Sequence, residues 1–306
     1  MLAAVLMFCT VSIASPGAQE PDAAQLVAQG RRLVTQGQLD SARALYQKAL
    51  AADPSLADAH LAMGILLDLD GAYANARTHL DKAVQLATPE IRNNGLNAMA
   101  ISFAFERKIA DAARVFQQVY DAHVQAGRVA EAAGTANALG RLYLEGGDPR
   151  NARRWYETGY EMARRQPDEP QSQLALWQFR WIHAQGRIAA RERRRDEARR
   201  QVEAARALQA STPALKDEGA TLAYLAGYVA LYAKEYKAAL AELSKADPRD
   251  PFILMLQAQA LAAVGDGAAS SRRWADVLES TGHNLQNAFA RPEARKRLAA
   301  RGKKIA

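Results

Sequence analysis

The sequence predicts an all-α protein made of helix pairs that repeat along the chain. The first observation is a pattern that occurs twice in residues 29–86 at an offset of 34 residues, so that Gly30 returns as Gly64 and Ala42 as Ala76. The second is the composition, because 49% of the residues are hydrophobic, many of them alanine, while only 7% are aromatic. A period of this length is typical of a helix–turn–helix unit that stacks on copies of itself, and small side chains suit closely spaced helices.

The first 18 residues are predicted to be an export signal, followed by a linker over residues 19–24. They carry no charged side chain, and their roughly a dozen apolar residues suit a secretory signal, whereas a membrane span needs ~20. Small side chains offer cleavage after Ala14 or, as an alternative, after Ala18. No Lys or Arg precedes Leu2, which leaves a second interpretation, an uncleaved weak membrane anchor. We expect an exported protein, periplasmic in a bacterium or secreted.

Two regular repeats follow the linker, the first over about residues 23–56 and the second over about residues 57–89. In the first, Gly37 lies near the turn between the helices, and Pro54 ends the second helix because proline lacks the N–H that another turn needs. The small side chain of Gly30 indicates that the two helices approach closely there, where added methylenes would force overpacking of ~1–3 kcal/mol.

The later repeats are located by an alanine that is followed four residues later by a large side chain. This pair recurs at spacings of 34, 36, 40, 46 and 41 residues, with the alanines at Ala42, Ala76, Ala112, Ala152, Ala198 and Ala239. Longer units are tolerated because each repeat touches only its neighbours. A seventh, degraded pair is expected over residues 252–279. Beyond it, Leu285 and Phe289 are expected to pack on the last pair and Pro292 to start a new helix, within a basic capping segment over residues 281–306.

The glycine, the spaced alanine and the Asp-Pro at the end of the unit, repeated at this period, resemble the tetratricopeptide-repeat family. The resemblance implies a right-handed α-α superhelix of about six to seven helix pairs over residues 25–280, with a C-terminal capping helix and no sheet. It also implies a non-enzymatic scaffold that binds a protein or peptide segment. In this family such ligands are commonly held in a concave groove lined by the first helix of each pair.

Counting positions along those first helices places two runs on the predicted groove face. One is an arginine strip with spacings of 3, 4 and 4 residues, and the other is a tyrosine wall with spacings of 4 and 4. Together they suit an extended peptide with acidic groups, because arginine pairs with carboxylates in a fork. The alternative is that the tyrosines are core and the arginines solvated. The predicted groove residues are Asn97, Asn137, Arg141, then Arg180, His183, Arg187 and Arg191 of the strip, and Tyr224, Tyr228 and Tyr232 of the wall.

The formal charge of +7 is unevenly distributed along the chain. Residues 180–200 carry a net charge of +5 and residues 291–304 a net charge of +6, so the remainder is acidic. Nucleic acid is not an expected partner, because no interleaved aromatic residues accompany the arginine-rich helix. The basic C-terminus suggests an alternative function, that of an envelope-associated structural component that contacts an anionic membrane or polymer.

Catalytic, cofactor and metal sites are not expected. The five histidines are scattered without a His-x3-His pair, and the sequence contains neither a Gly-x-Ser-x-Gly motif nor a phosphate-binding glycine loop. Cys9 is the only cysteine and would leave with the signal, which excludes thiolate chemistry in the mature chain. A hydrolytic function would require carboxylates or histidines to converge in the groove.

Overall fold

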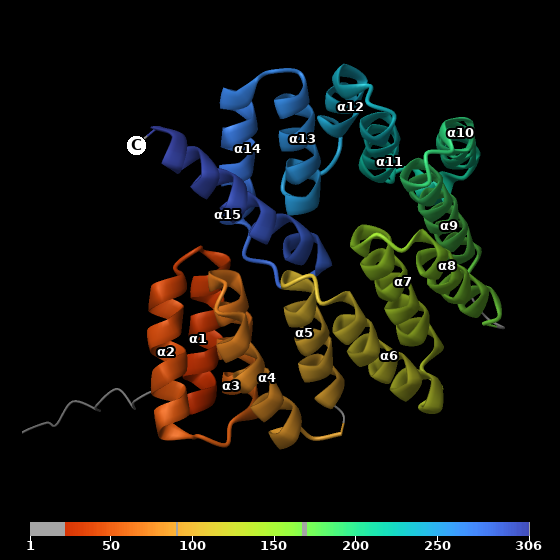
Figure 1. Cartoon of the computed structure of the whole chain (residues 1–306). Coiled ribbons are helices and arrows are strands. Elements are labelled where there is room, and N and C mark those ends of the chain that lie inside the picture. Colours follow the sequence, from red (N-terminus) through yellow and green to blue (C-terminus); the bar gives the residue numbers. More distant parts are fainter. Residues whose placement is uncertain (1–21, 90, 167–169, 306) are drawn as a thin grey trace, which may run out of the picture.

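The computed structural model describes residues 22–89, 91–166 and 170–305. Within these ranges all regular secondary structure is helical, with seven helix pairs followed by a single helix, α15 (Leu285–Ile305) (Figure 1). The pairs are α1 (Ala23–Thr35) with α2 (Leu39–Ala52), α3 (Ala57–Asp70) with α4 (Tyr73–Leu86), α5 (Arg92–Phe105) with α6 (Ile109–Gln125), α7 (Val129–Gly146) with α8 (Pro149–Arg164), α9 (Gln171–Arg191) with α10 (Arg195–Ser211), α11 (Gly219–Tyr232) with α12 (Tyr236–Leu243), and α13 (Pro251–Ala263) with α14 (Gly267–Glu279). A 3-10 turn, η1 (Pro213–Leu215), precedes α11. The predicted all-α superhelix is confirmed, while the predicted export signal lies outside the described residues.

In four of the described helix pairs a glycine of the first helix faces a large residue of the second at close range, whereas Gly186 of α9 faces Leu225 of α11 in the next pair. A Cβ atom added to Gly140 would lie 2.7 Å from the ring of Tyr156, and one added to Gly64 would lie 2.7 Å from Leu80. The same relation joins Gly30 to Tyr46 and Gly227 to Leu243. These separations are shorter than any carbon–carbon contact allows, so the glycines set the spacing within the pairs.

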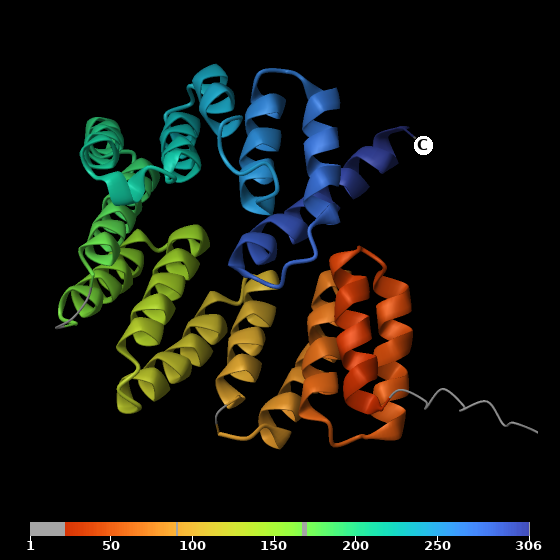
Figure 2. The same cartoon turned by 180° about the vertical axis from the view of Figure 1, so that it is seen from behind.

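The last helix, α15, does not simply cap the final pair but crosses back to the N-terminal half of the array (Figures 1 and 2). It packs on α13 and α14, and also on α5 and α7. Arg291 donates from Nε to the carbonyl oxygen of Leu69 at 2.7 Å and from Nη1 to that of Leu278 at 2.7 Å. Arg107 in turn donates to the carbonyl oxygen of Phe289 at 2.9 Å. Helix α15 therefore ties the second and third repeats to the seventh.

Pro292 lies inside α15, so the expectation that it starts a helix is wrong. A proline within a helix removes one backbone hydrogen bond and crowds the preceding turn. Here Ala288 and Phe289 before the proline and Ala294 after it are all fully buried. Packing on both sides of Pro292 offsets the lost hydrogen bond and keeps the helix continuous.

Two glycines of α7 test the role of close packing. Gly140→Ala is expected to lower the free energy of unfolding by about 1–3 kcal/mol, because the new Cβ overlaps the Tyr156 ring. Gly134→Ala is the matched control, since nothing lies within 4 Å of its added Cβ. It is expected to raise the free energy of unfolding by roughly 0.5–1 kcal/mol, as alanine does in a helix. Urea unfolding measures both changes, and stabilisation by both substitutions would contradict the close contact.

Candidate functional site

The structure brings the arginine strip and the tyrosine wall together between α7, α9 and α11. Arg187 donates from Nη2 to the hydroxyl of Tyr156 at 2.8 Å and from Nη1 to that of Tyr224 at 3.5 Å. Arg191 donates to the hydroxyl of Tyr232 at 3.1 Å. The two runs predicted to be neighbours therefore share direct hydrogen bonds.

Glu145 of α7 lies at the centre of these contacts. Its carboxylate lies 3.6 Å from Nη1 of Arg187 and 3.0 Å from Nη1 of Arg191, and it accepts a hydrogen bond from the Tyr228 hydroxyl at 3.3 Å. The Glu145 side chain is only 4% exposed and that of Arg187 only 6%. Removing one partner of such a buried ion pair would leave an uncompensated charge. We call this set the buried network; it comprises Glu145, Tyr156, Arg187, Arg191, Tyr224, Tyr228 and Tyr232.

Burial and neighbouring charges shift the pKa values of Tyr224, Arg187 and His183. Burial raises the pKa of Tyr224 to about 12, so its hydroxyl remains a neutral donor and acceptor at pH 7. Burial alone would lower the pKa of Arg187, but the oxygens of Tyr156, Tyr224 and Glu145 raise it above its usual value. His183 lies beside Tyr224, with ring centroids 5.1 Å apart. Burial, and then the charges of Arg187 and Arg141, hold the pKa of His183 well below 6.5, so its ring is neutral.

The predicted groove residues differ in how much solvent can reach them. Arg180 is exposed, whereas His183, Arg187, Tyr224 and Tyr228 are buried and Asn97, Asn137, Arg141, Arg191 and Tyr232 are partly buried. Among the described residues, no hydrogen bond joins Asn97 or Asn137 to the buried network. The tyrosines pack as core residues, but the inner arginines are paired with Glu145 rather than solvated. Binding of a ligand by these ten residues stays a prediction.

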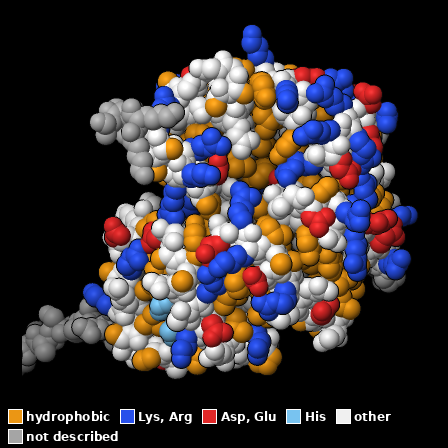
Figure 3. Space-filling model, viewed as in Figure 1, with side chains coloured by type: hydrophobic (Ala, Val, Ile, Leu, Met, Phe, Trp, Pro, Cys, Tyr) orange, Lys and Arg blue, Asp and Glu red, His pale blue; other side chains and the backbone are white. Residues whose placement is uncertain are grey.

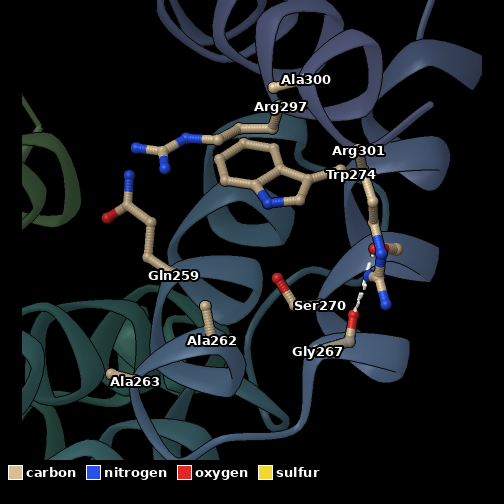
Figure 4. A pocket seen from close by; sticks show the side chains of 10 residues that line it. Gln259, Ala262, Ala263, Gly267, Ser270, Trp274, Arg297, Ala300 and Arg301 are labelled. Carbon is tan, nitrogen blue, oxygen red and sulfur yellow. Dashed lines mark hydrogen bonds between the residues drawn. The ribbon is translucent and has the colours of Figure 1, made fainter. Parts of the chain in front are cut away.

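An open groove lies between α13, α14 and α15, close to the buried network. It has a volume of about 710 Å³, and we call it the α15 groove. Figure 4 shows Trp274 at its centre, with Gln259 and Arg297 on one side and Arg301 reaching Gly267 on the other. Arg301 donates to the carbonyl oxygen of Gly267, which joins the end of α15 to the start of α14.

A second pocket of about 450 Å³ continues from the α15 groove along α13. The two share Gln259 and Ala263. We call this second space the rim pocket; it is lined by Arg191, Arg193, Tyr232, Lys234, Tyr236 and Gln259, among others. No Asp or Glu is among the residues that line either space. In the upper half of Figure 3, where α11 to α15 lie, hydrophobic side chains are surrounded by Lys and Arg side chains.

Comparison with known proteins identifies the type of repeat. Residues 27–91 match the family model described as tetratricopeptide repeat. The solved apo form of RapI is similar to this chain with a TM-score of 0.59 and 13% identity, over 91% of this chain and 99% of that one. A tetratricopeptide repeat protein from Parabacteroides merdae ATCC 43184 is similar with a TM-score of 0.54 and 14% identity, over 88% and 98% of the two chains. This chain has a tetratricopeptide-repeat fold. No curated protein matches it.

The repeat register places Glu145 at a groove-facing position of the fourth repeat, but neither Glu145 nor Tyr156 was among the ten predicted groove residues. Glu145 lies five residues after Gly140, as Arg191 lies five residues after Gly186, so the two occupy equivalent repeat positions 46 residues apart. The sequence does not show that Glu145 also reaches Arg187, which is 42 residues away. In the described part of the chain, no three His, Cys, Asp or Glu side chains are grouped to hold a metal ion. No described helix is both long and apolar enough to span a membrane.

His183 makes the stability of the array depend on pH. Its pKa is lowered in the folded state, so below about pH 6.5 the unfolded chain binds a proton that the folded chain does not. Stability is therefore lost as the pH falls through this range, by up to about 1.4 kcal/mol per pH unit from this residue. His183→Gln is expected to flatten the dependence measured by urea unfolding between about pH 7.5 and pH 5. Parallel profiles for the two proteins would contradict a neutral, buried His183.

Proposed function

We propose that this chain is an exported, non-enzymatic scaffold that binds a segment of another protein. The observation that carries the proposal is that the α15 groove and the rim pocket adjoin along α13, where both are lined by Gln259 and Ala263. Helical repeat arrays present extended surfaces of this kind, and long partner segments are held across several repeats. An apolar centre at Trp274 with polar and cationic groups around it suits a peptide that offers both kinds of side chain.

The basic C-terminus gives less support to the alternative, contact with an anionic membrane or polymer. Arg291 and Arg295 both donate to the carbonyl oxygen of Leu69, and Arg301 donates to that of Gly267. Arg291 is buried and Arg295 partly buried in these contacts, so a membrane surface would not reach them freely, whereas Arg301 stays exposed. We therefore favour protein binding.

Photo-crosslinking in cells tests the proposed binding surface. A photoreactive amino acid would replace Ala263 or Ala300, both of which are exposed and line the α15 groove. The same group at Ala241, exposed on α12 and outside the α15 groove and the rim pocket, is the matched control. The expected result is a discrete protein adduct from the two groove positions and none from Ala241. Adducts of equal yield from all three positions, or none from any, would argue against the proposal.

Export is tested by the N-terminus of the protein recovered from cells. The support for export is the uncharged, apolar stretch in the first 18 residues. Intact-mass analysis of the fraction outside the cytoplasm is expected to find a chain that starts at Ser15 or Gln19. A chain lacking residues 1–18 is the control and is expected to stay in the cytoplasm. Recovery of the full chain only in the cytoplasm would disprove export.

A further inference from the structure

The turn within each helix pair contains one residue with a left-handed backbone, two positions before the second helix begins. In four repeats this residue is a glycine, namely Gly37, Gly71, Gly147 and Gly265. In the other three it is a cation, with φ of 59° at Arg107, 62° at Arg193 and 66° at Lys234. This conformation is unfavourable for residues other than glycine. The backbone at Arg107, Arg193 and Lys234 is therefore strained, and strain of this type is found at functional sites.

Arg107 shows what a cation at this turn position can do. Its Nη2 donates to the carbonyl oxygen of Phe289 at 2.9 Å, and its Cζ lies 4.4 Å from the centre of the Phe289 ring. Phe289 belongs to α15, 182 residues further along the chain. The cation in the turn of the third repeat therefore binds a second polypeptide segment through its backbone and its aromatic ring.

Arg193 and Lys234 occupy the same turn position in the fifth and sixth repeats, but they face open space. Both are exposed and both line the rim pocket. Within the described ranges, no carboxylate forms an ion pair with either of them. The acidic residues next to them in sequence are already paired, Glu192 with Arg153 and Arg194, and Glu235 with Arg199. The rim pocket therefore presents positive charge that the described part of the chain does not neutralise.

We propose that Arg193 and Lys234 form a docking site for an acidic segment of a partner protein. This inference rests on the proposed function and names the chemical class of the partner. Charge complementarity favours carboxylates at the two turn cations. Tyr232 and Tyr236 line the same pocket and add aromatic surface that ends in a polar hydroxyl group. The bound segment continues past Gln259 into the α15 groove, where its apolar side chains meet Trp274.

The test uses two synthetic peptides of about twelve residues and fluorescence polarisation with the mature chain. One peptide alternates Glu with Leu, and the other has Gln in place of each Glu. The expected result is that the Glu peptide binds about tenfold more tightly, since each exposed charge pair contributes a few-fold. The preference is expected to shrink at high salt, because exposed charges are screened.

Arg193→Gly combined with Lys234→Gly removes both turn cations from the rim pocket. It is expected to bind the Glu peptide as weakly as the Gln peptide while its melting temperature does not fall, because glycine suits the left-handed turn. Arg200→Gln combined with Lys216→Gln removes the same charge from exposed positions outside the rim pocket and is expected to keep the preference. Loss of affinity without loss of stability separates docking from a folding defect.

Two results would overturn the docking site. The first is a failure of charge recognition by the turn cations, seen either as equal affinity for both peptides or as a double glycine variant that keeps the preference for Glu. The second is binding to phosphatidylglycerol vesicles that requires Arg193 and Lys234 while neither peptide binds, because the surface would then contact a membrane. Either result leaves the proposed function in place if Ala263 and Ala300 still crosslink a protein in cells. Failure of those crosslinks would instead overturn the proposed function.

Discussion

The contact between a glycine on the first helix of a pair and a large side chain on the second is the constraint on which the array depends. In the fourth repeat, the ring of Tyr156 packs against Gly140 and its hydroxyl accepts a hydrogen bond from Arg187 at 2.8 Å. One side chain thus fixes the spacing within its own pair and binds an arginine of the next repeat. The repeat pattern and the buried network are therefore physically linked, since moving Tyr156 would disturb both.

Helix α15 makes this chain differ from an array in which each repeat touches only its neighbours. Asp68 of α3 is fully buried, accepts a hydrogen bond from Ser102 of α5 at 2.8 Å and lies 2.8 Å from Nε2 of His283, just before α15. Together with the bonds of Arg291 and Arg107, this contact joins segments more than 180 residues apart. Such long-range contacts couple the second and third repeats to the last one, and Leu69, Phe105 and Phe289 belong to one core. The first helix pair packs in a separate hydrophobic cluster. They also hold α15 in place as one wall of the groove.

The helix pairs could be predicted from the sequence because their signals are local. A glycine opposite a large residue and a fixed spacing between alanines depend only on neighbouring helices. The sequence contains no such local signal for the helices on which α15 packs. Arg291 and Arg295 bind the carbonyl oxygen of Leu69 in the last turn of α3, where backbone oxygens have no partner within the helix. A backbone oxygen is present at every residue, so no residue type in the sequence marks Leu69 as the partner.

The candidate site was predictable in part for the same reason. Helical spacing placed the strip and the wall on facing surfaces, and the structure joins them through Arg187 and Arg191. Burial of Arg187 depends on Glu145 reaching it from α7, and the repeat register places Glu145 on the groove face without showing which arginine it pairs with. The left-handed turns at Arg193 and Lys234 were also missed, because the repeat pattern leads one to expect glycine there.

Three groups of cations in the described part of the chain differ in their environment, and this is why the net charge of +7 is a poor guide to function. Arg187 and Arg191 share one buried carboxylate, that of Glu145, which compensates one of their two charges inside the fold. The arginines of α15 bind backbone carbonyl oxygens at helix ends, and they act as structural ties. Arg193 and Lys234 belong to neither group, since they are exposed in strained turns beside open space. Exposed charge that lies beside an open pocket can meet a bound segment, which is why we propose that the turns of the fifth and sixth repeats set the binding specificity.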